Sequence, residues 1–132
     1  MAGRIFTNRE LDVMSILWRT GGATVNDVRE RLGEDLAYTS VLSALQTLEE
    51  KGYVTHEAEG RAYRYLALIE PEEAGRNALS RILDKVFDGS AESLLAQLVE
   101  ERNLSRAELE RMRGMLEDRL EKKAAKRRKG SA

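Results

Sequence analysis

The chain has 132 residues, of which 42% are hydrophobic and 34% are charged, with a single proline. This length and composition predict one compact domain or two very small ones, mainly helical, with no large enclosed catalytic core. There is no cysteine and His56 is the only histidine, which excludes thiolate chemistry and predicts that neither a metal nor a cofactor is bound. No apolar run approaches the ~20 residues of a membrane span, so we expect a cytoplasmic protein.

The net charge of −1 is unevenly distributed along the chain. Residues 1–69 hold eight basic and ten acidic side chains, residues 70–121 hold eight and thirteen, and residues 122–132 hold six and none. The last segment also lacks large apolar residues, which predicts a basic, disordered tail. Because the N-terminal half is slightly acidic, any binding of nucleic acid must depend on where its few cations lie.

Three short helices are predicted in the first fifty residues. Thr7 and Glu10 have the spacing of a capping box at the start of the first, and Thr24 and Asp27 repeat it for the second. The third helix is expected over 38–51, where one stripe is apolar and the opposite face is rich in hydroxyl and amide groups.

A β-hairpin is predicted directly after these helices. Residues 53–57 read as a strand, 58–60 as a turn and 61–68 as the second strand. Three helices followed by a hairpin predict a mainly α protein that begins with a winged helix-turn-helix DNA-binding domain over residues 5–69, the hairpin being its small β wing.

Three further helices with continuous apolar stripes are predicted over residues 70–121. They are too short to form a stable core alone, so we expect a three-helix dimerisation domain in a two-fold homodimer, which implies a near-palindromic operator. The alternative is that this segment folds back on the winged helix. The predicted dimerisation residues are Leu79, Leu83, Phe87, Leu94, Leu95, Leu98, Leu109, Met112 and Leu116.

The predicted DNA contacts from the third helix are uncharged side chains that form hydrogen bonds. Thr39, Ser40 and Ser43 lie near its N-terminal end, where hydroxyls reach base edges and phosphates. Gln46 and Thr47 lie one turn further on, and we expect them to contact the DNA backbone or nothing.

Tyr38 and two wing arginines complete the predicted interface. The Tyr38 hydroxyl is placed to contact phosphate, with a purely structural role as the alternative. Arg61 and Arg64 need not share a face of the wing, and Arg61 is favoured for phosphate because it is nearer the turn. Tyr63 and Tyr65 are expected to cover the core rather than stack on bases.

Several segments taken together resemble one family, the penicillinase repressors of the BlaI/MecI type. The similarity extends over about residues 5–120, and the combination of segments is specific although each one alone is weak. The segments that carry it are Leu11–Trp18, Thr24–Val25, Asp35–Leu42, Leu48–Val54, Gly60–Tyr65, Phe87–Ser90 and Leu104–Ser105.

The resemblance implies a homodimeric repressor that binds double-stranded operator DNA, with the helix over 38–51 in the major groove. It also implies release by proteolysis within the middle dimerisation helix, at an Asn-Phe bond, triggered by a membrane-bound sensor of β-lactams. The matching positions here are Gln97 and Leu98, a departure that leaves the inducing signal open. A copper-responsive branch uses cysteine ligands, which this chain lacks.

Two other functions are alternatives to a DNA-binding repressor. An enzyme would need a nucleophile with its base, a metal constellation or a phosphate loop, and the sequence has none of these. The second alternative is a winged helix that docks other proteins without specific DNA binding. Salt-sensitive retardation of the chain's own promoter fragment, compared with random DNA, separates the two.

Overall fold

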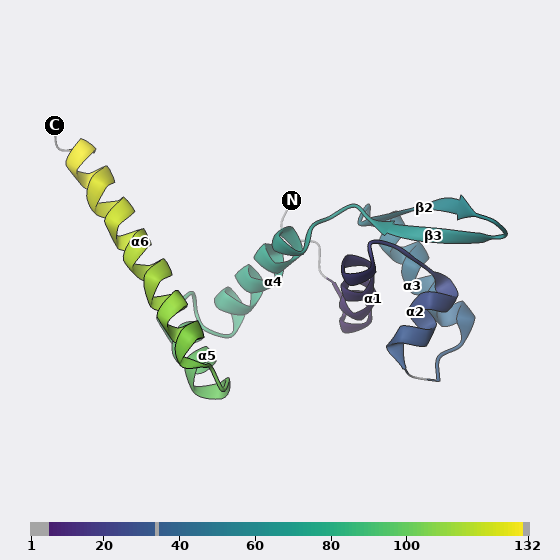
Figure 1. The fold of residues 1–132 in the computed structure, drawn as a ribbon, viewed down its shortest axis with the longest axis horizontal. Helices are drawn as coiled ribbons and strands as arrows, with labels where there is room; N and C mark the ends of the chain where they lie inside the picture. The colour runs from purple at the N-terminus through teal and green to yellow at the C-terminus, as the bar shows by residue number, and fades with distance from the viewer. Residues whose placement is uncertain (1–5, 34, 131–132) are drawn as a thin grey trace. The chain divides into compact units, whose positions relative to one another are not determined.

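The computed structural model describes residues 6–33 and 35–130, which fall into two compact units divided between Asp88 and Gly89. The fold is mainly helical with a small antiparallel sheet, as the sequence predicts (Figure 1). The first unit contains α1 (Asn8–Thr20), β1 (Ala23–Thr24), α2 (Val25–Leu32), α3 (Tyr38–Glu50), β2 (Val54–Glu59), β3 (Ala62–Ala67) and α4 (Pro71–Lys85). The second contains α5 (Ala91–Glu101) and α6 (Arg106–Gly130).

Both predicted capping boxes are present. At α1 the hydroxyl of Thr7 accepts the Glu10 N–H at 3.1 Å, and the Glu10 carboxylate accepts the Thr7 N–H at 2.8 Å. At α2 the same exchange joins Thr24 and Asp27, with both distances at 3.2 Å. Each box satisfies backbone donors that the first turn leaves without a partner, so both helices have a fixed start.

The sheet has three strands rather than the two predicted, in the order β1-β3-β2. The extra strand is β1, in which Ala23 pairs with Tyr65 and Thr24 pairs with Arg64. Gly22 leads into it with φ 135°, and a Cβ there would lie 2.6 Å from Leu66 Cδ2. Glycine is favoured here because residues with side chains rarely adopt this φ, and the pattern of a two-residue strand does not reveal it in the sequence.

The hairpin turn begins two residues later than predicted and ends one residue later. Ala58 and Glu59 belong to β2, paired with Tyr63 and Ala62, and the turn is formed by Gly60 and Arg61. A two-residue turn with glycine at positive φ suits the twist of the flanking strands, whereas the predicted turn over 58–60 would shorten the ladder.

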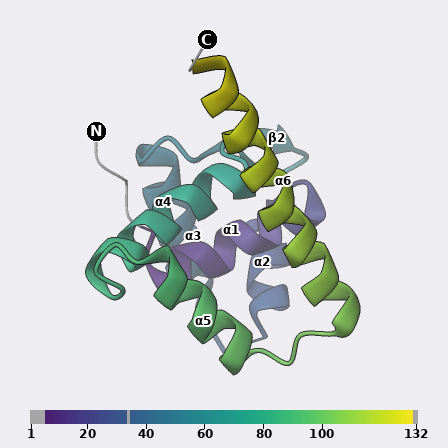
Figure 2. The same cartoon turned by 90° about the vertical axis from the view of Figure 1, so that its left-hand side faces the viewer.

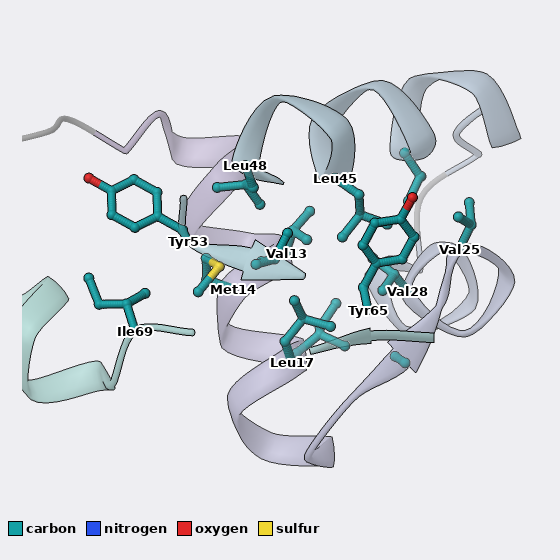
Figure 3. Packing of buried hydrophobic residues seen from close by; sticks show 14 of the residues in the cluster. Val13, Met14, Leu17, Val25, Val28, Leu45, Leu48, Tyr53, Tyr65 and Ile69 are labelled. Carbon is teal, nitrogen blue, oxygen red and sulfur yellow. The ribbon is translucent and has the colours of Figure 1, made fainter. Parts of the chain in front are cut away.

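The core of the first unit is formed by the inner faces of α1, α2 and α3 together with the sheet (Figure 3). The Trp18 indole packs against this core and donates a hydrogen bond to the Ile69 carbonyl at 2.8 Å. The buried hydrophobic residues are Val13, Met14, Ile16, Leu17, Ala23, Val25, Val28, Val41, Leu45, Leu48, Tyr53, Val54, Tyr65, Ile69 and Ala74.

Helix α4 groups with the first unit, although the sequence predicted a boundary between residues 69 and 70. Its attachment is local, because Ala74 is buried in the core cluster and the preceding Ile69 is held by Trp18. The rest of its apolar stripe is not buried, since Leu79, Ile82 and Val86 are all exposed.

The second unit has no buried residue among those the structure describes. Helix α6 is one unbroken helix (Figure 2). The prediction of a disordered tail is therefore wrong for residues 122–130, while 131–132 lie outside the described residues. Alanine, lysine and arginine favour helix, and cations near a helix C-terminus are stabilised by its dipole, so this segment extends α6 without tertiary contacts.

Candidate nucleic-acid interface

Helix α3 has one buried face and one polar face. Val41, Leu45 and Leu48 are fully buried against the core. The opposite face bears the predicted contact residues, all of them exposed: Thr39, Ser40, Ser43, Gln46 and Thr47. The core therefore fixes the rotation of α3 and leaves an uncharged face, able to donate and accept hydrogen bonds, directed to solvent.

The N-terminal end of α3 differs from those of α1 and α2. Its N-cap residue is Ala37, and within the described residues no side chain caps the first turn. The first-turn N–H groups at Tyr38 and Thr39 are thus not used by a side-chain acceptor. Such donors, reinforced by the helix dipole, favour a phosphate oxygen.

A groove of about 750 Å³ lies between α3 and the hairpin β2–β3. It brings together three of the predicted DNA-binding residues, Tyr38, Gln46 and Arg61. The sequence interpretation missed the others that line it, which are Leu42, Glu49, Glu50, His56, Ala62, Tyr63 and Tyr65. Of the five polar-face residues only Gln46 lines the groove, so the groove joins one edge of that face to the wing, and the other four lie outside its lining: Thr39, Ser40, Ser43 and Thr47.

His56 has a structural role that the sequence did not indicate. Its Nδ1 lies 2.7 Å from Glu49 Oε1 and 2.9 Å from Oε2, which joins β2 to the last turn of α3. Its ring also meets the Tyr63 ring edge-on, with centroids 4.7 Å apart. These contacts hold the wing against α3, and because Glu49 and His56 lie in different elements, the periodicity of neither element predicts them.

The two wing tyrosines have different environments, so the prediction that both cover the core is wrong for Tyr63. Tyr65 is buried, and this burial, with the nearby Glu49 carboxylate, raises the pKa of its phenol. Tyr63 lies on the same strand face but is 56% exposed. The hairpin extends beyond the core towards Gly60, so a face that is buried at one end of β3 is open at the other.

The two wing arginines are also placed differently. Arg61 is exposed in the hairpin turn and lines the groove. Arg64 lies in the middle of β3, where its guanidinium donates to the Gly21 carbonyl at 3.5 Å. Its side chain is directed to the loop between α1 and β1, away from the groove residues.

An ion pair fixes the C-terminal end of α3. Lys51 Nζ lies 2.9 and 2.8 Å from the two carboxylate oxygens of Glu10, whose side chain is almost fully buried. Burial alone would raise the pKa of Glu10, but the hydrogen bonds from Lys51 and from the Thr7 backbone, with the Lys51 charge, hold that pKa below its ordinary value. The start of α1 is thereby joined to the end of the polar helix.

Two classes of site have no candidate in the part of the chain that the structure describes. Residues 6–33 and 35–130 contain no group of three or more His, Cys, Asp or Glu side chains placed to hold a metal ion. None of the helices described is long and apolar enough to cross a membrane.

Comparison with known proteins identifies the family. The family model described as penicillinase repressor matches residues 6–118. The chain belongs to the penicillinase repressor family. This is a family of winged-helix transcriptional repressors, not of enzymes.

Its relatives within the penicillinase repressor family have low sequence identity to this chain but match most of its length. The transcriptional regulator BlaI of Mycobacterium tuberculosis is 37% identical over 95 residues, which are 69% of each chain. The methicillin resistance regulatory protein MecI of Staphylococcus aureus is 25% identical, covering 83% of this chain and 91% of its own. The solution structure of the DNA-binding domain of the repressor BlaI aligns with a TM-score of 0.47 and 26% identity, over 52% of this chain and 85% of that chain.

The predicted dimerisation residues of this penicillinase repressor homologue are spread over three helices with incomplete burial. Leu79 on α4, Leu98 on α5, and Leu109 and Leu116 on α6 are exposed. The remaining five are only half-buried: Leu83, Phe87, Leu94, Leu95 and Met112. The predicted cleavage residues Gln97 and Leu98 lie on the exposed side of α5, within its helical span.

Proposed function

We propose that the protein is a homodimeric transcriptional repressor that inserts α3 into the major groove of a near-palindromic operator. The observation that carries this proposal is the face of α3 opposite the core, where hydroxyl and amide side chains are exposed on a helix whose rotation is fixed by Val41, Leu45 and Leu48. A surface helix seldom presents such a run of uncharged hydrogen-bonding groups, and the major groove offers them a distinct pattern of partners at each base pair.

Within this interface we assign different roles to different residues. Thr39, Ser40 and Ser43 contact base edges, since they lie in the first turns of α3, which would enter the groove. The open first-turn N–H groups of α3 and the Arg61 guanidinium bind phosphates on either side and set the register. Arg64 contributes less, because its guanidinium is directed to Gly21.

Dimerisation is proposed from the apolar side chains that no element of the single chain covers. Leu79, Leu98 and Leu116 are each more than two-fifths exposed, which is costly for an isolated chain and is relieved when the same faces of a second copy pack against them. A dimer also doubles the contact made by one small winged helix, which supports useful specificity.

Release of the operator is proposed to follow cleavage at Gln97–Leu98 by a protease linked to a membrane sensor. The bond is helical in the structure, and the Leu98 carbonyl accepts the Arg102 N–H at 3.1 Å. A protease binds its substrate in an extended form, so α5 must unwind locally first. Because α5 has no buried residue among those described, contacts within its own chain hold it weakly, and the contacts of the proposed dimer are the main opposition to its unwinding.

The test is a titration of the full chain against a duplex from its own promoter and against random-sequence duplex of equal length. We expect tighter, salt-sensitive binding to the promoter, and at least a tenfold loss of that preference in a Thr39→Ala, Ser40→Ala, Ser43→Ala variant. Ser80→Ala, an exposed hydroxyl on α4, is the matched control and should change nothing. Equal binding to both duplexes by the unmodified chain would favour a protein-docking winged helix instead.

A further inference from the structure

The last two turns of α6 form an exposed basic helix, which we call the basic end and define as residues 122–130. It contains six lysines and arginines and no acidic residue, and every side chain in it is exposed. We propose that the basic end is a second, sequence-independent DNA contact that binds phosphates flanking the operator. This proposal extends the proposed function, since it concerns the same DNA ligand.

The charges of α6 divide sharply along its length. Residues 106–121 contain four basic and five acidic side chains, and exposed pairs such as Arg106–Glu110 at 3.2 Å and Arg113–Glu117 at 3.6 Å compensate one another. From Lys122 onwards the sequence contains no Asp or Glu. The first part of the helix therefore has nearly equal numbers of acidic and basic side chains, whereas the basic end has a net side-chain charge of +6, which attracts polyanions.

Helical geometry arranges five of these six cations on one side, Arg128 being the exception. Lys122, Lys126 and Lys129 have the i, i+4, i+7 spacing that places side chains above one another, and Lys123 and Arg127 form a second row beside them. Successive cations in a row are separated by about 5–6 Å along the helix, which is comparable to the spacing of phosphates on one DNA strand. Because the segment is already helical, binding does not require its backbone to be ordered first.

The charge balance of the rest of the chain favours DNA as the partner. Residues 1–69, which contain the proposed recognition helix, sum to −2, and residues 70–121 sum to −5. Neither segment attracts a polyanion over distance, whereas the basic end contributes +6 in each chain. In a dimer two such ends supply the long-range attraction that the winged helix lacks.

An anionic membrane surface is a poorer fit to the same charges. A helix that lies on a membrane needs large apolar side chains beside its basic face. The only apolar residues in the basic end are Ala124 and Ala125. Their small side chains cannot anchor a helix among acyl chains.

The experiment compares two triple variants of the full chain. Lys126→Gln, Arg127→Gln and Lys129→Gln remove three charges from the basic end, and Arg106→Gln, Arg111→Gln and Arg113→Gln remove three from the balanced part of the same helix. Far-ultraviolet circular dichroism verifies that both retain their helix. Binding to the promoter duplex and to a random-sequence 40-base-pair duplex is measured over a range of KCl concentrations.

The basic-end variant should reduce the slope of log K against log [KCl] by at least ~2 per dimer, because each phosphate contact contributes ~0.9. Its affinity at 0.15 M salt should fall at least tenfold and by the same factor on both duplexes, since phosphate contacts carry no sequence information. The balanced-part variant should change the slope by less than ~1.

An unchanged slope in the basic-end variant, or equal losses in the two variants, would overturn the inference. A membrane result would overturn it too. In that case the unmodified chain would co-sediment with phosphatidylglycerol vesicles at 0.15 M salt, the basic-end variant would not, and the salt slope of the variant on DNA would be unchanged. Failure of the proposed function looks different, because the unmodified chain would then bind promoter and random duplex equally, and the slope on random duplex would still report on the basic end.

Discussion

The two units of this chain are stabilised in different ways. The first encloses fifteen buried hydrophobic residues between three helices and a sheet, while α5 and α6 bury none of the residues that the structure describes. Leu17, Leu45 and Leu48 of the first unit are fully buried in its core, whereas Leu98, Leu116 and Leu120 of the second unit are exposed. The same residue type thus stabilises one unit within the chain and, in our proposal, stabilises the other only between chains.

The largest expected effect comes from making the same substitution in both units. Leu45→Ala should destabilise the first unit by about 2–5 kcal/mol, because Leu45 is fully buried and its removal leaves a cavity. Leu120→Ala, at 68% exposure, should change that stability by less than ~0.5 kcal/mol. Urea unfolding followed by the fluorescence of Trp18, the single tryptophan, measures the first unit directly. Similar losses in the two variants would abolish the distinction between the units.

The second prediction concerns the assembly that should cover the exposed leucines. Leu98→Asp should weaken dimerisation by about 3 kcal/mol, roughly 100-fold in the dimer dissociation constant, since it introduces a carboxylate into an apolar contact. Sedimentation equilibrium measures the dissociation constant, and DNA titration should show a parallel loss. Gln97→Asp adds the same charge at the neighbouring position and should have a much smaller effect. A monomeric Leu98→Asp variant with full promoter affinity would contradict the dimer model.

The Glu10–Lys51 ion pair sharpens the comparison further, because it is a partly buried charge pair within the well-packed unit. Lys51→Met leaves the buried Glu10 carboxylate without its cation and should cost about 2–3 kcal/mol, less than for a fully buried pair because Lys51 is one-third exposed. Glu10→Gln should cost about 1–3 kcal/mol. Urea unfolding at pH 7 measures both. If neither substitution lowers stability, α3 is positioned by apolar packing alone.

The same pair predicts how stability depends on pH. The pKa of Glu10 is lower in the folded chain than its ordinary value, so the folded state is favoured above the unfolded pKa of about 4.3 and loses that contribution as pH falls through the folded pKa. The difference in unfolding free energy between the unmodified chain and Glu10→Gln should therefore shrink between pH 6 and pH 3. A constant difference over this range would show that the carboxylate charge contributes nothing.

The smallest effect is expected for the exposed ion pairs of α6. Arg113→Ala removes the pair with Glu117 and should change helix stability by less than ~0.5 kcal/mol, because both side chains are solvated and the pair is screened by salt. Thermal melting followed at 222 nm measures it. A loss of more than 1 kcal/mol would indicate that Arg113 is buried in an assembly, as the apolar residues of α6 are proposed to be.

Local interactions were readable from the sequence by itself. The capping boxes of Thr7 and Thr24, the apolar stripe of α3 and the hairpin residues are each defined by neighbours within a few positions, so their physical basis is present in the sequence pattern. The same local patterns also predicted the family to which the chain belongs. They could not show that residues 122–130 are helical, because the absence of apolar partners indicates disorder unless helix propensity and the C-terminal dipole compensate.

Only the tertiary structure decided which distant groups meet. Strand β1 is formed by the pairing of Ala23 with Tyr65, and the wing is held to α3 by His56 and Glu49. The Glu10–Lys51 pair joins residues forty-one positions apart. Such contacts depend on how the helices and strands pack against one another, and the pattern of apolar residues in the sequence does not predict them. The polar face of α3 was visible in the sequence, but only the fold shows that Tyr38 and Gln46 share a groove with Arg61 of the wing.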